Sequence, residues 1–360
     1  MKTRNIKQRG GFVIVVVLSI VTMLAVILLC FNRQSEKDLL AAEGLEETYQ
    51  AYNCARSGLN IAIAAINPPS ADPGIIADKS YVRPGGFSSG KIFNIDLCRC
   101  SVKITDESSR INLNRLIDEQ GKPCRAAIEQ FYRLIDVLNR QGGPHIDYGI
   151  VPAIIDWIDA DDNIAALPPV SGVAPLLQNG NIGAESAYYM KLNPPYKCRN
   201  APLETVDELL LVRGITSETY SRIRNYVTVC GDGKININFA AKEVIESLSE
   251  KMDVCLAQAI IDNRGEKFFD TVAQLRQFPW MTDAIYNEIK DKLTTKPAEQ
   301  YYTITSRAEY ASSPGDSETA ANGYCVVAMI KLDEQTKKVN VLWCREFNCE
   351  RAGASEGKNG

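Results

Sequence analysis

The chain has 360 residues, 45% of them hydrophobic, and a formal net charge of −4. This length and composition allow a sizeable folded core and exclude a largely disordered chain. The small net charge excludes a strongly basic surface over the whole chain, of the kind that binds nucleic acid.

The first predicted element is a membrane-spanning helix at residues 12–31. This apolar stretch contains no charged residue, and a helix of about 20 residues can cross a bilayer core of about 30 Å. Four basic residues precede it, whereas Glu36 and Asp38 follow it closely. This charge bias predicts a cytoplasmic N-terminus and an exported remainder. The basic residues are Lys2, Arg4, Lys7 and Arg9.

The residues around this helix bear on the kind of signal it carries. A cleavable secretory signal has an apolar core of about 7 to 15 residues and a small-x-small site behind it, and Cys30-Phe31-Asn32 is no such site. An uncleaved signal anchor stays an alternative. The basic leader at residues 1–11 ends in two glycines before Phe12, which resembles the type IV prepilin signal. The resemblance implies cleavage by a prepilin peptidase between Gly11 and Phe12, with methylation of the new Phe12 amine.

Helical spacing of apolar residues continues beyond the anchor to Ile66, and Pro68-Pro69 ends it. We predict one helix over residues 12–66, about 80 Å long at 1.5 Å per residue. Its exported part covers residues 32–67. This is the shape of a pilin stem, whose lower half packs against other stems and whose upper half packs against its own head domain.

Strand-like alternation appears on both sides of a long helical region. We therefore predict an α+β fold, in which residues 68–111 and 295–350 form a pilin-like head with an antiparallel sheet. The Pro- and Gly-rich start of the head is expected to be a loop, and residues 351–360 a flexible tail. The predicted strands are residues 91–105, 301–310, 323–332 and 339–347.

Residues 112–294 are predicted to form a large inserted all-helical domain. This region contains an internal sequence repeat: Ile-Asn-Leu-Asn at residues 111–114 matches Ile-Asn-Ile-Asn at residues 235–238. Each copy precedes a helix, so Asn114 and Asn238 are predicted N-caps. Duplicated helical units of the helix-hairpin-helix or SAM-like kind are the simplest cause.

Four motifs in this order, together with the leader, resemble the K-type minor pseudopilin of type II secretion systems. Prepilin-like chains usually carry a glutamate at the fifth mature position, and this chain has Val16 there, as the K-type members also lack the acid. The motifs are Ser109-Arg-Ile-Asn-Leu-Asn-Arg-Leu116, Ile154-Ile-Asp-Trp-Ile-Asp-Ala-Asp161, Pro202-Leu-Glu-Thr-Val-Asp-Glu-Leu-Leu-Leu-Val-Arg-Gly-Ile215 and Ile235-Asn-Ile-Asn238.

The resemblance implies a subunit that caps the tip of the periplasmic pseudopilus and helps to initiate its assembly, for export of folded proteins across the outer membrane. The implied partners are the I-type and J-type minor pseudopilins, the major pseudopilin and the prepilin peptidase. The implied location is the bacterial inner membrane, with a single pass and the bulk of the chain in the periplasm.

A membrane-anchored DNA-binding protein of an uptake or type IV pilus system is the alternative function. Leu-Val-Arg-Gly-Ile-Thr at residues 211–216 fits a helix-hairpin-helix turn, whose backbone N–H groups meet phosphate. The segment that we take as the matching turn, residues 249–254, has no glycine, and acids such as Glu204 and Glu208 surround the first turn. Because acids repel phosphate, we expect no nucleic-acid partner.

We predict no enzymatic activity. The sole histidine, His145, lies in a Gly-Gly-Pro-His turn without a nucleophile motif beside it, and a turn-packing role is expected. The sequence contains no Gly-x-Ser-x-Gly elbow, no Walker loop and no His-Glu-x-x-His motif.

An acidic cluster in the predicted insertion indicates a site for a hard cation. Asp159, Asp161, Asp162 and Glu185 are the predicted ligands, because Ca²⁺ takes 6 to 8 oxygen ligands from carboxylates and loop carbonyls. Asp156 is set aside, since it lies within an apolar helix and is expected to cap or pair locally. The pattern is no EF-hand. The family's helical domain holds calcium near such acids, which favours Ca²⁺, and solvated acids after a helix end are the alternative.

Eleven cysteines are many for a cytosolic protein, and ten remain outside the membrane when Cys30 is excluded. An oxidising compartment therefore favours disulfides. Spacing alone does not assign the pairs, and buried free thiols are the alternative.

Overall fold

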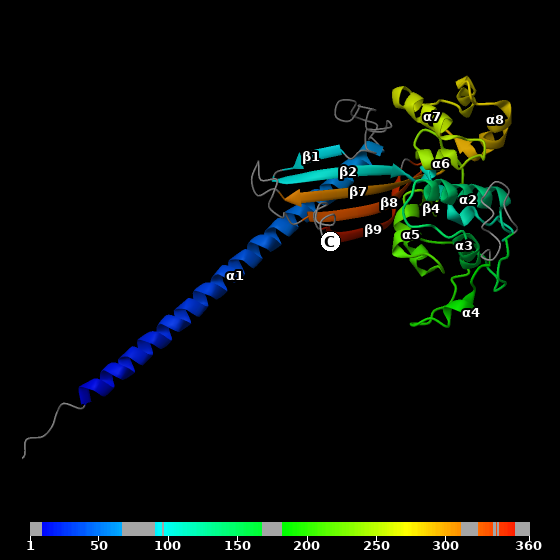
Figure 1. The fold of residues 1–360 in the computed structure, drawn as a ribbon. Helices are drawn as coiled ribbons and strands as arrows, with labels where there is room; N and C mark the ends of the chain where they lie inside the picture. The colour runs from blue at the N-terminus through cyan, green and yellow to red at the C-terminus, as the bar shows by residue number, and fades with distance from the viewer. Residues whose placement is uncertain are drawn as a thin grey trace, which may run out of the picture.

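The computed structural model describes residues 9–66, 91–95, 97–167, 182–310, 323–333, 336 and 338–349. It consists of a long N-terminal helix, a five-stranded antiparallel sheet and a mainly helical insertion (Figure 1). The predicted α+β class is confirmed. Most of the predicted leader, the connection at residues 68–90 and the predicted tail at residues 351–360 lie outside the described residues.

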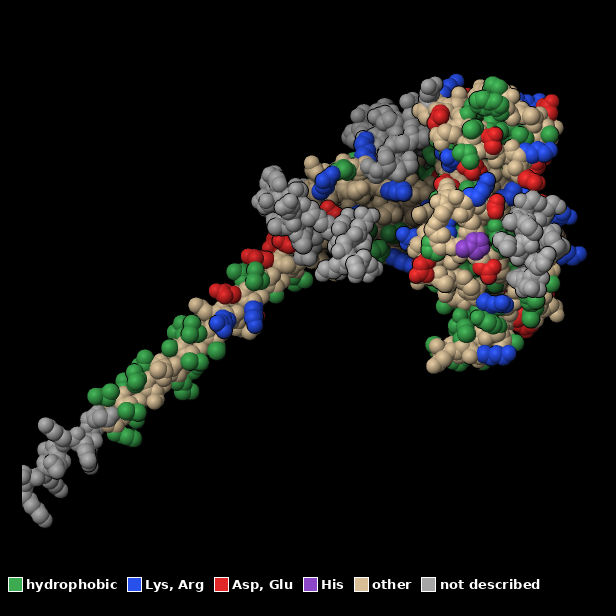
Figure 2. All heavy atoms as spheres, viewed as in Figure 1, with side chains coloured by type: hydrophobic (Ala, Val, Ile, Leu, Met, Phe, Trp, Pro, Cys, Tyr) green, Lys and Arg blue, Asp and Glu red, His purple; other side chains and the backbone are tan. Residues whose placement is uncertain are grey.

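The stem helix α1 (Arg9–Ile66) is a single helix of 58 residues. Its first half is apolar on all sides and exposed, and hydrophobic side chains cover it in Figure 2. Among the described residues it is the one helix that is long and apolar enough to cross a membrane. Its last turns change character, because Ala51, Ala55 and Ala62 are completely buried against the sheet. The sequence analysis predicted both features, the apolar first half and the packing of the second half against the head.

The sheet has the order β1-β2-β7-β8-β9, and every neighbouring pair is antiparallel. Where we predicted one strand at residues 91–105, the structure has a hairpin, because the chain turns back after Ile95 and β1 pairs with β2. The alternation continued across the turn, so periodicity alone could not locate it. The strands are β1 (Lys91–Ile95), β2 (Cys98–Asp106), β7 (Gln300–Tyr310), β8 (Gly323–Leu332) and β9 (Val339–Cys349).

Small residues let α1 lie close against the sheet. A Cβ atom added at Gly58 would lie 2.3 Å from Ser306 Oγ and 2.5 Å from Cys100 Sγ, so only glycine fits at this position. Around this contact, Val102 of β2 and Val326 and Ile330 of β8 complete a core of their own. This core holds the stem to the head.

The insertion lies between β2 and β7 and has a separate, larger core. It differs from the all-helical prediction in two short pairs of parallel strands, β3 with β4 and β5 with β6. Its strands are β3 (Ile111–Asn112), β4 (Val227–Thr228), β5 (Ile235–Asn236) and β6 (Leu293–Thr294). Its α-helices are α2 (Arg125–Arg140), α3 (Ile150–Ile158), α4 (Ser186–Tyr189), α5 (Ser217–Ile223), α6 (Lys242–Glu246), α7 (Val254–Glu266) and α8 (Asp283–Ile289). Its 3-10 turns are η2 (Glu107–Ser109), η3 (Leu113–Arg115), η4 (Val206–Leu211), η5 (Val272–Gln277) and η6 (Lys290–Lys292).

The repeated Ile-Asn-x-Asn text corresponds to a repeated structure, but Asn114 and Asn238 are not the N-caps we predicted. The Asn114 side chain bonds both the N–H and the carbonyl of Leu203, at 2.8 and 3.0 Å. Asn238 does the same to Phe269, at 2.9 and 3.0 Å. An amide side chain carries both a donor and an acceptor, so it can pair with a distant backbone as a strand would. The preceding asparagine makes the local contact instead: Asn112 accepts from the Asn114 N–H.

Each clamped residue opens a matching second half of the unit. Leu203 leads into η4 through a capping box of Thr205 and Glu208, and Phe269 leads into η5 through a capping box of Thr271 and Gln274. A threonine N-cap then starts α5 in one unit and α8 in the other. Duplicated local signals therefore produce duplicated units.

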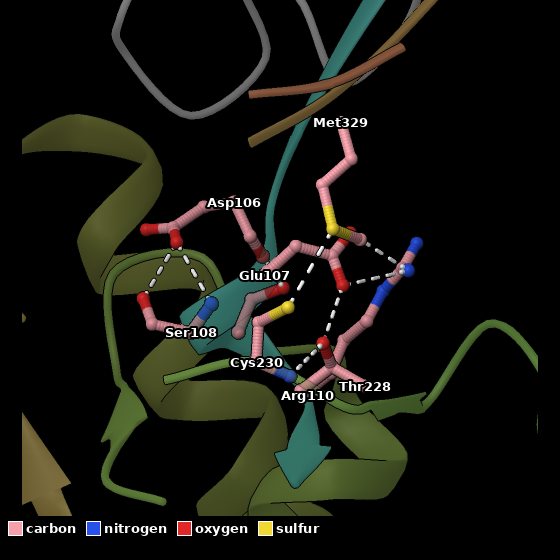
Figure 3. A network of polar contacts seen from close by, with 8 residues as sticks. Asp106, Glu107, Ser108, Arg110, Thr228, Cys230 and Met329 are labelled. Carbon is pink, nitrogen blue, oxygen red and sulfur yellow. Dashed lines mark hydrogen bonds and ion pairs between the residues drawn. The ribbon is translucent and has the colours of Figure 1, made fainter. Parts of the chain in front are cut away.

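Two consecutive acids at the end of β2 join the head to the insertion (Figure 3). Asp106 accepts hydrogen bonds from the Ser108 N–H and hydroxyl, at 2.9 and 2.6 Å, and from the Asn236 amide of β5 at 2.9 Å. Burial raises the pKa of Asp106, and these hydrogen bonds oppose the shift. Glu107 is 1% exposed and accepts from the Thr228 hydroxyl of β4 at 2.6 Å. One acid thus holds each half of the insertion.

Replacement of Asp106 by alanine is expected to destabilise the junction, because it leaves the Asn236 amide buried without its acceptor. We expect Asp106→Ala to lower the free energy of unfolding by about 2–3 kcal/mol. Chemical denaturation of Asp106→Ala, Asn236→Ala and the double variant would measure the coupling. Asp291→Ala, at an exposed aspartate, should stay within about 0.5 kcal/mol of the parent chain. Additive effects of the two junction substitutions would contradict the contact.

Candidate functional site

Three buried carboxylates converge inside the insertion. Asp156 lies in α3, Asp159 directly follows α3, and Glu185 precedes α4. Each offers an oxygen, and these three oxygens lie within 4.8 Å of one another. The side chains are 0%, 8% and 3% exposed, so water does not separate the charges.

The local sequence explains this convergence. Every residue of α3 is buried, so Asp156 is carried into the core with its apolar neighbours. The helix ends at Ile158, and the extended backbone of Asp159 places its carboxylate beside that of Asp156. Gly183 brings the second segment close: a Cβ atom there would lie 2.0 Å from Asp156 Oδ2. The glycine therefore leaves the space that the carboxylate fills.

Burial and mutual repulsion perturb all three acids. Desolvation raises the pKa of Asp156 to about 6, and the backbone N–H of Ala165, at 2.8 Å, opposes the shift. Desolvation, followed by the charge of Asp156, raises the pKa of Asp159 to about 7. Desolvation and the charges of Asp156 and Asp159 likewise raise the pKa of Glu185 to about 7. Each shift has the direction expected for like charges held together away from water.

The cluster has the properties of a site for a hard cation. Asp156 Oδ2, Asp159 Oδ1 and both Glu185 oxygens are buried without a hydrogen-bond partner among the described residues. No salt bridge from the described part of the chain reaches them. A divalent cation would satisfy the oxygens and offset their repulsion, and an all-carboxylate set suits Ca²⁺ or Mg²⁺ better than a softer metal.

The predicted ligand set overlaps this cluster only in part. The structure brings together Asp159 and Glu185, whereas Asp161 and Asp162 are exposed and make other contacts. Asp161 accepts from the Asn163 N–H at 2.7 Å, and Asp162 accepts from the Asn200 amide at 3.2 Å. Part of the predicted acidic loop, residues 168–181, lies outside the described residues.

The predicted ligand set did not include Asp156, which the structure places beside Asp159 and Glu185. Asp156 also pairs locally, as expected, because it accepts a hydrogen bond from the Ala165 N–H at 2.8 Å. Its place beside Asp159 depends on the end of α3 at Ile158 and on the extended backbone of Asp159, which the spacing of the residues does not reveal.

The helix-hairpin-helix turn packs onto the same region. Gly214 has a φ of +82°, as such a turn requires. The adjacent Arg213 donates to the Gly183 carbonyl at 3.0 Å and lies over the Tyr188 ring. The positive side chain of this turn is therefore engaged within the protein, beside the acids.

The matching turn of the second unit is not the one we assigned. Residues 249–254 connect α6 to α7, whereas the turn between η5 and α8 corresponds to the Gly214 turn. Trp280 takes the place of Gly214 there and is 61% exposed. This second turn also lacks a glycine. The two units therefore share their capping boxes and threonine N-caps but differ in the turn between them.

The remaining predicted site residues are at the membrane end and in a turn. The helix α1 includes Gly11 and Phe12, and Phe12 is exposed. His145 is exposed, with its ring 6.0 Å from that of Tyr148.

A long apolar N-terminal helix laid across a small antiparallel sheet defines a pilin-like protein, and the large insertion distinguishes it from a simple pilin. Two family profiles, both described as type II secretion system protein K, match residues 175–232 and residues 235–296. Over these residues the chain is similar to this family, the K-type minor pseudopilins of type II secretion.

Relatives named type II secretion system protein K occur in several bacteria. The protein of Pseudomonas aeruginosa is 30% identical over 171 residues, which cover 47% of this chain and 46% of that protein. The protein of Aeromonas hydrophila is 24% identical over 281 residues, which cover 72% of this chain and 77% of that protein.

A solved structure has a similar fold. A chain in the crystal structure of the GspK-GspI-GspJ complex from enterotoxigenic Escherichia coli matches with a TM-score of 0.60 and 18% identity. The match covers 85% of this chain and 99% of that chain. The two chains therefore share a fold over the matched part.

A methyl group at Gly183 should destabilise the insertion, because it would collide with the Asp156 carboxylate. We expect Gly183→Ala to lower the free energy of unfolding by about 1–3 kcal/mol, as overpacking does. Gly265→Ala is the matched control: Gly265 lies in α7 with open space around it, so alanine should stabilise by up to about 1 kcal/mol. Thermal unfolding of both variants would test this opposition of sign, and equal effects would contradict it.

Proposed function

We propose that this chain caps the tip of the type II secretion pseudopilus and helps to initiate its assembly, for export of folded proteins across the outer membrane. The position of the insertion carries this proposal: it lies at the end of the head that faces away from the free part of α1 (Figure 1). A subunit stacked above this one would meet that bulk. An ordinary subunit of stem and small head has no such obstacle.

The stem gives the proposed orientation. The apolar part of α1 lies in the inner membrane, the basic leader stays cytoplasmic, and the head and insertion are periplasmic. The prepilin peptidase would cut between Gly11 and Phe12 and leave the helix in the membrane. Phe12 would then carry the methylated amine.

Val16 adds a second reason for a terminal position. In this proposal, an ordinary subunit uses the acid at the fifth mature position to meet the amine of its neighbour. A valine cannot form that pair, so the chain would lack one contact of a filament subunit. The partners would be the I-type and J-type minor pseudopilins, in line with the GspK-GspI-GspJ complex that contains the structural relative, and then the major pseudopilin.

A glutamate at position 16 should restore the missing contact. We expect the unmodified chain at one end of pseudopili, located by immunogold labelling of purified filaments. Val16→Glu found along their length would assign the terminal position to the missing acid, and Val16→Glu still at one end would assign it to the bulk of the insertion. Val17→Glu, which adds the same acid one position later, should stay at one end. Mass spectrometry of each variant should find a methylated Phe12 as the first residue, so that failed processing is recognised. The unmodified chain spread along the filament would contradict the cap.

We also propose that Asp156, Asp159 and Glu185 hold Ca²⁺ when the protein is exported. The four orphaned buried oxygens support this, because folding without a counter-charge brings like charges together. When bound, the cation would offset most of the negative charge of the cluster and join the end of α3 to the start of α4. The chain's own contribution is to hold the carboxylates in place and to exclude water.

Calcium should raise the thermal stability of the full chain, and a chelator should lower it. At free calcium a hundred-fold above the dissociation constant, the expected gain is about 2.7 kcal/mol. Asp159→Asn removes one repelling charge, so in chelator it should be at least as stable as the parent and should lose the response to calcium.

Asp162→Asn, at an exposed aspartate outside the three-residue cluster, is the matched control and should keep the response to calcium. Identical unfolding curves of the parent chain in calcium and in chelator would refute the proposed site.

A further inference from the structure

Three cysteines meet where the stem crosses the sheet. Cys54 comes from α1, and Cys98 and Cys100 come from the same face of β2. All three are buried, with exposed fractions of 3%, 4% and 0%. No disulfide joins cysteines of the described residues.

Cys54 and Cys100 belong to one buried core where α1 crosses the sheet. Gly58, one turn after Cys54, leaves the space that Cys100 Sγ occupies, and a Cβ atom there would lie 2.5 Å from that sulfur. Cys100 Sγ also lies 3.4 Å from the Ser306 hydroxyl of β7. The sulfur of Cys100 is therefore held against the helix face that carries Cys54.

The pKa values of the two thiols are shifted in opposite directions. The hydrogen bond from Cys54 lowers the pKa of Cys100 to about 7, burial opposes this shift, and Ser306 supports it. The same hydrogen bond and burial raise the pKa of Cys54. Cys100 is thus the more acidic of the two thiols, and a thiolate is the form that attacks a disulfide.

We propose that Cys54 and Cys100 form a disulfide that fixes the stem helix to the head. The proposal rests on the periplasmic placement of the head in the proposed function, because disulfides persist in that oxidising compartment. Cys98 also contacts Cys54, but it lacks the Gly58 space and the Ser306 contact that hold Cys100 in place.

The oxidant is the disulfide of a dithiol–disulfide oxidoreductase. The Cys54 thiolate attacks this disulfide during folding and forms a mixed disulfide, which releases one thiolate of the donor. The Cys100 thiolate then attacks the Cys54 sulfur and displaces the second donor thiolate. Two S–H bonds are lost and one S–S bond forms in this chain, the S–S bond of the donor breaks, and the donor takes up the two electrons and two protons and leaves as a dithiol.

Such a bond would act at the contact between α1 and the sheet, where a pull along the stem helix reaches the head. In the proposed function, assembly would move the apolar part of α1 out of the membrane, whereas the contact with the sheet depends on small side chains such as Ala55 and Gly58. Small side chains bury little area, so they give limited resistance to a pull along the helix. A covalent link would transmit that pull to β2, and through Asp106 and Glu107 to the insertion.

Peptide mapping of the full chain would test the pair. Cells are quenched with acid and a thiol-blocking reagent, and the membrane fraction is digested with trypsin without reduction. Cleavage after Arg99 separates the two candidate partners, so Cys54 is carried by residues 38–56, Cys98 by residues 92–99 and Cys100 by residues 100–103. We expect residues 38–56 linked to residues 100–103, and the link should vanish on reduction.

Two cysteine variants test which residue of β2 pairs with Cys54. The link should persist in Cys98→Ser and disappear in Cys100→Ser. Linkage of residues 38–56 to residues 92–99 in the parent chain, or blocked thiols at both Cys54 and Cys100, would overturn the assigned disulfide.

A membrane-impermeant maleimide added to spheroplasts should label the exposed Cys344, which trypsin releases in residues 339–345. Labelled Cys344 with blocked, unlinked Cys54 and Cys100 overturns the disulfide and leaves the proposed function standing. Unlabelled Cys344 overturns the periplasmic orientation, on which both depend.

Discussion

The close contact between α1 and the sheet is the constraint on which the rest of the molecule depends. One helix must be apolar enough for lipid over its first half and must present small residues to a folded head over its second half. Gly58 and the buried alanines meet the second requirement, because larger side chains would push the helix off Cys100 and Ser306. The position of the sheet on the stem then determines where β2 ends, and so where the insertion begins.

Beyond the end of β2, polar contacts join the insertion to the head, whereas α1 is held to the sheet by close apolar packing. The insertion touches the head through buried hydrogen bonds to Asp106 and Glu107, and at the surface Arg345 of β9 ion-pairs with Asp207 of η4. Buried polar contacts of this kind are directional, and an unpaired member is costly, so they specify one orientation of the insertion. Apolar packing alone would permit more rotation between two separate cores. Both duplicated units contact the head, because Asn236 belongs to one half and Thr228 to the other.

Features with a local signal could be predicted from the sequence, and features that depend on distant partners could not. The stem, the terminal strands and the duplication follow from apolar spacing, alternation and repeated text. The β1–β2 turn was missed because alternation does not register a change of direction. Asn114 was taken for a cap because its partner, Leu203, is far along the chain. Asp156 was excluded for the same reason: its relation to Glu185 exists only after α3 and α4 pack together.

The carboxylate cluster is the part of the insertion in which unbalanced charge opposes folding. Elsewhere in the described residues the buried acids Asp106 and Glu107 have donors, whereas Asp156, Asp159 and Glu185 leave four oxygens without one. Arg213 approaches from the Gly214 turn, but it donates to the Gly183 carbonyl, so it lowers the pKa of Asp156 only from a distance. A cation at the cluster would therefore act on the backbone that Arg213 already holds. The hairpin and the acids would then be stabilised together.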